Sequence, residues 1–136
     1  MSWDILVLDL PSDANKLADV PKDYRPSPIR RSEIINGIIE VLPIANFSNP
    51  AWGLIIDQDW SIEVNLGGEQ ECVSAMLHVR GGDGAVGAVA AIVRQLNLRA
   101  IDCGTGEFFA ADDNAMESFR RWRNYRDKVV KSIEST

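Results

Sequence analysis

The chain has 136 residues, of which 46% are hydrophobic and 25% charged, values typical of a folded globular protein. We therefore expect a single domain, residues 1–136, and exclude wholesale disorder. The formal net charge of -6 and the pI of about 4.7 argue against nucleic-acid binding, because a negative surface repels phosphates. The same charge is compatible with a basic protein partner.

The sequence predicts a cytoplasmic protein with no membrane span. Its first residues, MSWDILVLDL, contain Asp4 and Asp9 and no positively charged segment, unlike a signal peptide. No apolar run approaches the roughly 20 residues that a membrane helix requires. Cys72 and Cys103 lack the spacing of a paired ligand motif, and we expect free thiols in a reducing compartment.

The first elements are a strand, an arm and a helix. Trp3–Leu10 is rich in large apolar residues, and we predict a strand whose middle is buried on both sides. Residues 11–29 contain four prolines and predict an irregular Pro-rich arm with one helical turn near 15–19. Arg31–Leu42 has isoleucines at helical spacing, and Ser32 is the expected cap of this helix.

The middle of the chain predicts an antiparallel sheet. Two β-rich runs flank the turn at 57–59, as in a hairpin, and a third run follows at 73–80. The second and third of these runs alternate between apolar and polar residues, which is typical of a sheet with one covered side. We expect the core side to carry Ile62, Val64, Leu66, Ala75, Leu77 and Val79, and the other side to carry Ser61, Glu63, Asn65, Ser74, Met76, His78 and Arg80.

The last third predicts a helix, a strand and a longer helix. Asp83 is placed to cap a helix that runs to about Asn97, and Arg99–Cys103 has the composition of a strand. Met116, Phe119, Trp122, Val129, Val130 and Ile133 fall near one side of a helix over Asp113–Ile133. The order β-α-β-β-β-α-β-α predicts an α+β, two-layer sandwich with a mainly antiparallel sheet and helices on one face.

A glycine cluster between strand and helix matches the dinucleotide-binding pattern only superficially. Gly82, Gly84 and Gly87 fit G-x-G-x-x-G, and Asp102 lies twenty residues after Gly82. The preceding strand alternates, however, whereas a dinucleotide-domain strand is apolar on both faces. Asp83 would also place a carboxylate beside the diphosphate, where like charges repel. We therefore interpret the cluster as a structural turn and predict no cofactor.

The side of the sheet away from the core holds the candidate binding residues. Glu63, Asn65, His78 and Arg80 combine a carboxylate, an imidazole and a guanidinium, groups that do acid-base chemistry or bind anions. Exposed acid-base pairs are also ordinary on a solvated sheet. Trp52 is a core-edge anchor or an interface residue, and the GTGEFF segment presents Glu107 or forms a tight turn. A single histidine and scattered carboxylates predict no metal site.

The last helix is basic, although the protein is acidic. Residues 119–131 carry six Lys and Arg and one Asp, a local charge of +5, which leaves -11 for the remainder of the chain. Aromatic residues interleaved with arginines, as in FRRWRNYR, also occur in RNA contacts. We favour an amphipathic helix that docks through Phe119 and Trp122 and keeps its arginines in water, because the rest of the chain repels phosphates.

Four segments, MSWDILVLDLP, NFSNPAWG, LHVRGG and AIDCGTGEFF, resemble a group of small uncharacterised bacterial proteins. That resemblance spans most of the chain and implies a shared fold without any functional residue. In size and acidity the chain is also similar to immunity proteins of bacterial toxin systems. We expect a non-enzymatic protein-binding domain, such as an immunity protein that neutralises a basic toxin. The alternative is a small-molecule or enzymatic site around Glu63, His78 and Arg80, with Asp102 as a further carboxylate.

Overall fold

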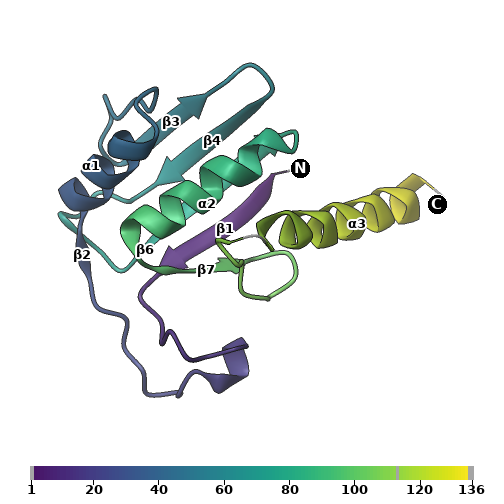
Figure 1. Cartoon of the computed structure of the whole chain (residues 1–136), viewed down its shortest axis with the longest axis horizontal. Coiled ribbons are helices and arrows are strands. Elements are labelled where there is room, and N and C mark those ends of the chain that lie inside the picture. Colours follow the sequence, from purple (N-terminus) through teal and green to yellow (C-terminus); the bar gives the residue numbers. More distant parts are fainter. Residues whose placement is uncertain (1, 113, 135–136) are drawn as a thin grey trace.

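The computed structural model describes residues 2–112 and 114–134. A five-stranded sheet, a two-stranded sheet and three α-helices make up the fold, which confirms the predicted α+β class (Figure 1). None of the described helices is both long and apolar enough to cross a membrane. The elements are β1 (Trp3–Leu8), a short 3-10 helix (Leu17–Asp19), β2 (Ile29–Arg30), α1 (Arg31–Val41), β3 (Trp52–Ile56), β4 (Trp60–Asn65), β5 (Glu71–Cys72), β6 (Ser74–Gly81), α2 (Gly84–Leu96), β7 (Arg99–Asp102) and α3 (Ala115–Glu134).

The large sheet has the order β3-β4-β6-β1-β7, and each neighbouring pair is antiparallel. The pairing of β1 with β6 and β7 brings the N-terminal strand to the inside of the sheet. Side chains alternate across the sheet, so that every second residue of each strand lies in the core. As predicted, Ile62, Val64, Leu66, Ala75, Leu77 and Val79 are buried.

All three helices cover the same face of this sheet. Ile34 and Ile38 of α1 and Phe119 and Trp122 of α3 belong to one hydrophobic cluster with α2 and the inward side chains of the strands. The small residues of α2, such as Ala85, are buried and allow that helix to lie close to the sheet. Burying these side chains is the main stabilising term of such a core.

Trp3 joins β1 to the C-terminal elements. Its side chain is completely buried, and its ring centroid lies 5.6 Å from that of Phe109, 5.0 Å from Phe119 and 6.2 Å from Trp122. Its indole N–H donates to a carboxylate oxygen of Asp102 at 2.9 Å. The other oxygen of Asp102 accepts from the backbone N–H of Gly104 at 2.8 Å, so this buried carboxylate is well satisfied.

The arm at 11–29 is irregular, as predicted, and its helical turn is the 3-10 helix Leu17–Asp19. Asp9 holds it at one point, because its carboxylate accepts from the backbone N–H of Ser27 and the hydroxyl of Tyr24, each at 3.0 Å. These two bonds, the Ser27 bond foremost, lower the pKa of Asp9. At a second point Arg99 donates to the carbonyl of Pro11 at 2.6 Å.

Several local predictions were wrong. β1 is buried on one side only, since its side chains alternate between buried and half-buried. Ser32 lies inside α1, whose cap position is occupied by Arg30. Asp83 does occupy the cap position of α2 but makes no side-chain capping bond, and its carboxylate pairs instead with Arg123 at 3.1 Å.

Other differences concern element boundaries. The pairing of β2 with β5 was not predicted, because each strand has only two residues. After β7, Phe108 forms one isolated bridge to Ile101 that the sequence did not predict. The expected start of the last helix at Asp113 and the side chain of Ile133 lie outside the described residues.

The glycine cluster is a turn whose essential member is Gly81, which the dinucleotide pattern does not include. Gly81 has φ +106, and a Cβ there would overlap the carbonyl oxygen of Asp59 and lie 2.6 Å from Cα of Trp60. A Cβ on Gly82 or Gly87 would meet nothing within 4 Å. The strand that precedes the turn is antiparallel to both neighbours, unlike a dinucleotide-binding strand.

Gly81→Ala is therefore expected to lower the free energy of unfolding by at least about 2 kcal/mol, since it combines a strained backbone with backbone overlap. Gly82→Ala is the matched control and should change the free energy of unfolding by less than about 1 kcal/mol. Urea denaturation followed by circular dichroism measures both. Equal destabilisation by the two substitutions would show that this turn is described wrongly.

Candidate functional site

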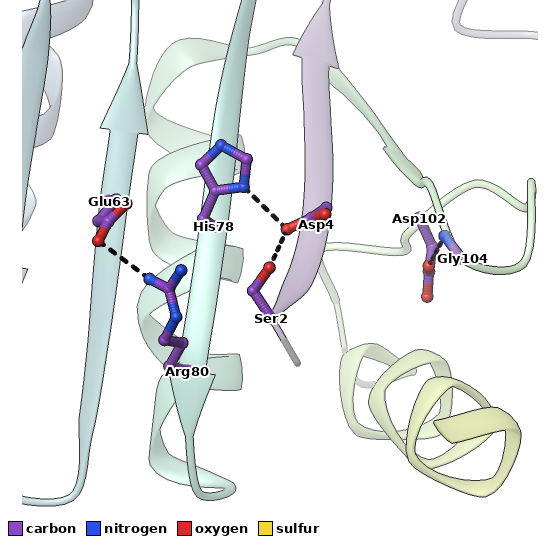
Figure 2. Close-up of polar contacts among 7 residues, drawn as sticks. All are labelled: Ser2, Asp4, Glu63, His78, Arg80, Asp102 and Gly104. Carbon is purple, nitrogen blue, oxygen red and sulfur yellow. Dashed lines mark hydrogen bonds and ion pairs between the residues drawn. The ribbon is translucent and has the colours of Figure 1, made fainter. Parts of the chain in front are cut away.

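The face of the sheet opposite the helices carries most of the predicted binding residues. We define the open face as the outward side chains of β3, β4, β6 and β1. In Figure 2 the labelled side chains of β4, β6 and β1 lie on the viewer's side of the strands, with α2 behind them. Strand register arranges the open face in rows, one of which is Leu54, Glu63, His78 and Asp4, and the next Trp52, Asn65, Met76 and Leu6.

His78 is held by a carboxylate and by an aromatic ring. Its Nδ1 lies 2.9 Å from Oδ1 of Asp4, the residue directly opposite on β1 (Figure 2). An ionised carboxylate can only accept, so the imidazole donates to Asp4 from Nδ1 in this contact. Trp52 stacks on the imidazole with ring centroids 6.1 Å apart and an interplanar angle of 21°. Ser2 donates its hydroxyl to the same Asp4 oxygen at 2.6 Å.

Glu63 and Arg80 form a second, separate pair. Arg80 Nη1 donates to Glu63 Oε1 at 3.0 Å, and both side chains are partly exposed. The three residues of the predicted acid-base site, Glu63, His78 and Arg80, are thus on one face but divided between two ion pairs. Each carboxylate already contacts a base on the neighbouring strand, which is the ordinary arrangement of a solvated sheet.

A strip of apolar side chains lies along β3. Trp52 and Leu54 are each 39% exposed and Ile56 is 66% exposed, while Ile55 between them is fully buried. These three side chains point away from the helices because alternate residues of a strand lie on opposite faces. Large apolar side chains gathered on one exposed strand are typical of a contact surface.

Backbone pairing closes much of both sheet edges. At the β3 edge, Asn46 and Leu54 exchange two backbone hydrogen bonds of 2.8 and 2.9 Å. At the β7 edge, Asp102 N–H donates to the carbonyl of Glu107 and Phe109 N–H to that of Ala100. A protected edge does not accept a further strand. The side chains of the open face are therefore more available for contact than the sheet edges.

Other predicted residues lie elsewhere or are engaged locally. Asn65 is on the open face, but its side chain accepts from the N–H of Gly67 at 3.2 Å. Glu107 lies in the loop after β7, where it pairs with Arg121 at 3.2 Å. Asp102, the further carboxylate of the alternative site, is buried on the helix side and cannot join His78.

Three hollows lie away from the open face. The largest of these, of about 510 Å³, is lined by residues that include Arg30, Arg31 and Glu71. A second, of about 380 Å³, lies between α1 and α2, and a third, of about 320 Å³, is lined in part by Glu107 and Arg121. Among the described residues, no group of three His, Cys, Asp or Glu side chains is placed to hold a metal ion.

The two cysteines are free thiols, one buried and one beside the open face. Cys103 is exposed, and its backbone N–H donates to the carbonyl of Asp4 at 3.0 Å. Partial burial, followed by the negative charges of Asp4 and Asp102, raises the pKa of the Cys103 thiol. A raised pKa leaves little thiolate at neutral pH, which is unfavourable for nucleophilic chemistry.

Comparison with protein families, with curated proteins and with solved structures finds no match for this chain. The resemblance to small bacterial proteins and to immunity proteins consequently stays a prediction. The case for a function has to come from the chain's own surface.

Sequence reasoning missed several members of the open face, among them Asp4, Leu54 and Ile56. Asp4 was assigned only to a buried strand, because its pairing with His78 depends on a contact between residues 74 positions apart. Leu54 and Ile56 were not selected, because every residue of β3 except Gly53 is large and apolar, so the pattern does not show which side is exposed. The one available signal was the alternation of the neighbouring strand β4.

The raised pKa of Cys103 predicts slow alkylation by iodoacetamide at pH 8, measured by mass spectrometry. Asp4→Asn removes a negative charge beside the thiol, lowers its pKa and should raise the rate about two- to fivefold. Asp13→Asn removes a charge from the exposed arm and is the control, with no change expected. An Asp4→Asn protein that reacts at the native rate would contradict this electrostatic description.

Proposed function

We propose that this chain is a protein-binding domain without catalytic activity and that its open face is the docking surface. The observation that carries this proposal is the exposed strip Trp52, Leu54 and Ile56 on a sheet face that no described helix covers. Tryptophan is enriched among the residues that contribute most to binding energy. Polar pairs beside it, Asp4 with His78 and Glu63 with Arg80, would supply the hydrogen-bonding rim.

The partner that fits this surface is a basic protein. The chain carries a net charge of -6, and the part outside residues 119–131 carries -11. A field of this sign accelerates the encounter with a basic partner and slows the encounter with an acidic one. Neutralising a basic toxin, as an immunity protein does, is a function of this kind. The small size and the acidity of the chain support this assignment.

The alternative, a small-molecule or catalytic site around Glu63, His78 and Arg80, has less support. Its favourable feature is the Asp4–His78 pair, in which a carboxylate orients an imidazole. Against this alternative, Glu63 and Arg80 neutralise each other. The ring of Trp52 also stacks on His78 and covers one side of the imidazole. The identity of the bound species decides between these two functions.

The binding test uses a photoreactive benzophenone amino acid at position 54 in living cells. We expect it to capture one discrete protein, whereas the same probe at position 36, on the exposed side of α1, captures none. The captured protein is then purified and titrated against the native chain. Its isoelectric point and activity show whether it is a basic toxin or another basic protein.

In that titration, Trp52→Ala combined with Leu54→Ser should weaken binding by about 100-fold, because two central apolar contacts are lost. The control is Ile39→Ala combined with Ile44→Ser, which removes exposed apolar side chains, 39% and 55% exposed, outside the open face. The proposal fails if the captured protein binds both variants equally well, or if position 54 captures nothing.

A further inference from the structure

Beyond Arg123, the described side chains of α3 are not buried against the body of the protein. The buried side chains of this helix are Ala115, Ser118, Phe119 and Trp122, and none of the described side chains from 123 to 132 is buried. At about 1.5 Å per residue, the segment 123–134 is about 18 Å long. Figure 1 shows this end of α3, in yellow, projecting beyond the other elements. Helical segments without tertiary packing are only marginally stable in water.

This projecting segment adjoins a stripe of unpaired cations. Arg121 and Arg123 pair with Glu107 and Asp83 of the body, at 3.2 and 3.1 Å. Arg120, Lys128 and Lys131, by contrast, form no ion pair with any side chain of residues 2–112 or 114–132. Spacings of eight and eleven residues place these three cations along one side of a helix.

Apolar side chains accompany those charges. Tyr125 is 48% exposed and Val130 is 41% exposed. The sequence continues its apolar helical pattern past Trp122, but the core against which that pattern packs ends there. A partner of this segment would therefore cover apolar atoms and meet lysines.

We propose that the projecting half of α3 binds the acidic β3–β4 turn of a second copy of this chain. That turn presents Asp57 and Asp59, which are exposed and form no ion pair with the described residues. Next to them lies Ile56, the most exposed of the large apolar side chains at 66%. An apolar side chain with two acids thus matches an apolar helix segment with two lysines.

Charge complementarity selects this occupant over others. The chain outside residues 119–131 carries -11, so the acidic counterpart of α3 exists on every copy. A nucleic acid or an anionic membrane bound to α3 would be repelled by that same negative charge, whereas a second copy of the chain supplies a negative surface that attracts α3. Two α3 helices packed against each other would place like charges together. In a two-fold dimer, each α3 can contact the turn of the other copy.

The inference shares only Ile56 with the proposed docking surface and does not involve Trp52 or Leu54. It uses α3 and the β3–β4 turn, so substitutions in either one leave the central residues of the open face intact. Loss of self-association without loss of partner binding, or the reverse, shows which of the two proposals has failed.

Sedimentation equilibrium of the full-length chain tests the contact. We expect a dimer at about 50 mM salt, with a dissociation constant that rises at least about tenfold at 500 mM, because exposed ion pairs are screened. Lys128→Glu with Lys131→Glu should weaken association by at least about tenfold. Lys16→Glu with Lys22→Glu makes the same change of charge in the exposed arm and should retain the native constant, apart from a small effect of net charge.

An exchange of charges between the two contacting surfaces is the decisive test. Asp57→Lys with Asp59→Lys should also abolish self-association, and an equimolar mixture of this variant with the Lys128→Glu, Lys131→Glu variant should form a heterodimer. Circular dichroism shows that each variant is folded. A monomeric native chain at low salt, a mixture that stays monomeric, or an arm variant as damaging as the α3 variant would overturn the proposal. A native monomer that retards a single-stranded oligonucleotide would indicate a nucleic-acid partner instead.

Discussion

The five-stranded sheet buries only one of its two faces, and this one-sided burial determines where every candidate residue lies. Trp3, Ile5 and Val7 of β1 are fully buried beneath helices, so the residues between them have to face the other way. A slip of one residue in the pairing of β1 with β6 would carry Trp3 out of its aromatic cluster and Asp4 into the core. The Asp4–His78 pair follows from this register, whereas the stacking of Trp52 on His78 follows from the pairing of β3 with β4 and of β4 with β6.

The parts of the fold that follow from local pattern could be predicted from the sequence. The alternation of β4 and β6 placed Glu63 and His78 on the open face, and the apolar periodicity identified the helices. Long-range pairing could not be predicted, which is why the partner of His78 and the two-residue strands were missed. Gly81 was overlooked because the close approach of Asp59 and Trp60 to it is a tertiary contact that no glycine motif records.

Positive and negative charges are concentrated on different parts of the molecule. The body is acidic and the last helix is basic, and the two meet where Arg123 pairs with Asp83 and Arg121 with Glu107. These contacts hold only the first half of α3. Exposed ion pairs contribute little to stability, so the unpaired lysines further along have more significance for encounters with other molecules than for folding. The open face, with its apolar strip and balanced ion pairs, is chemically distinct from this helix.

The claim that one face of the sheet is bare can be tested most directly by hydroxyl-radical footprinting of the purified chain, at about 0.5 M salt to screen weak association. The four tryptophans act as internal reporters, since Trp52 is 39% exposed whereas Trp3 is 0% and Trp122 is 5% exposed. Our account predicts rapid oxidation of Trp52 and of Leu54 beside it, with Trp3 and Trp122 protected. Protection of Trp52 to the same degree as Trp3 in the monomer would show that the open face is covered, and would contradict the docking surface proposed for it.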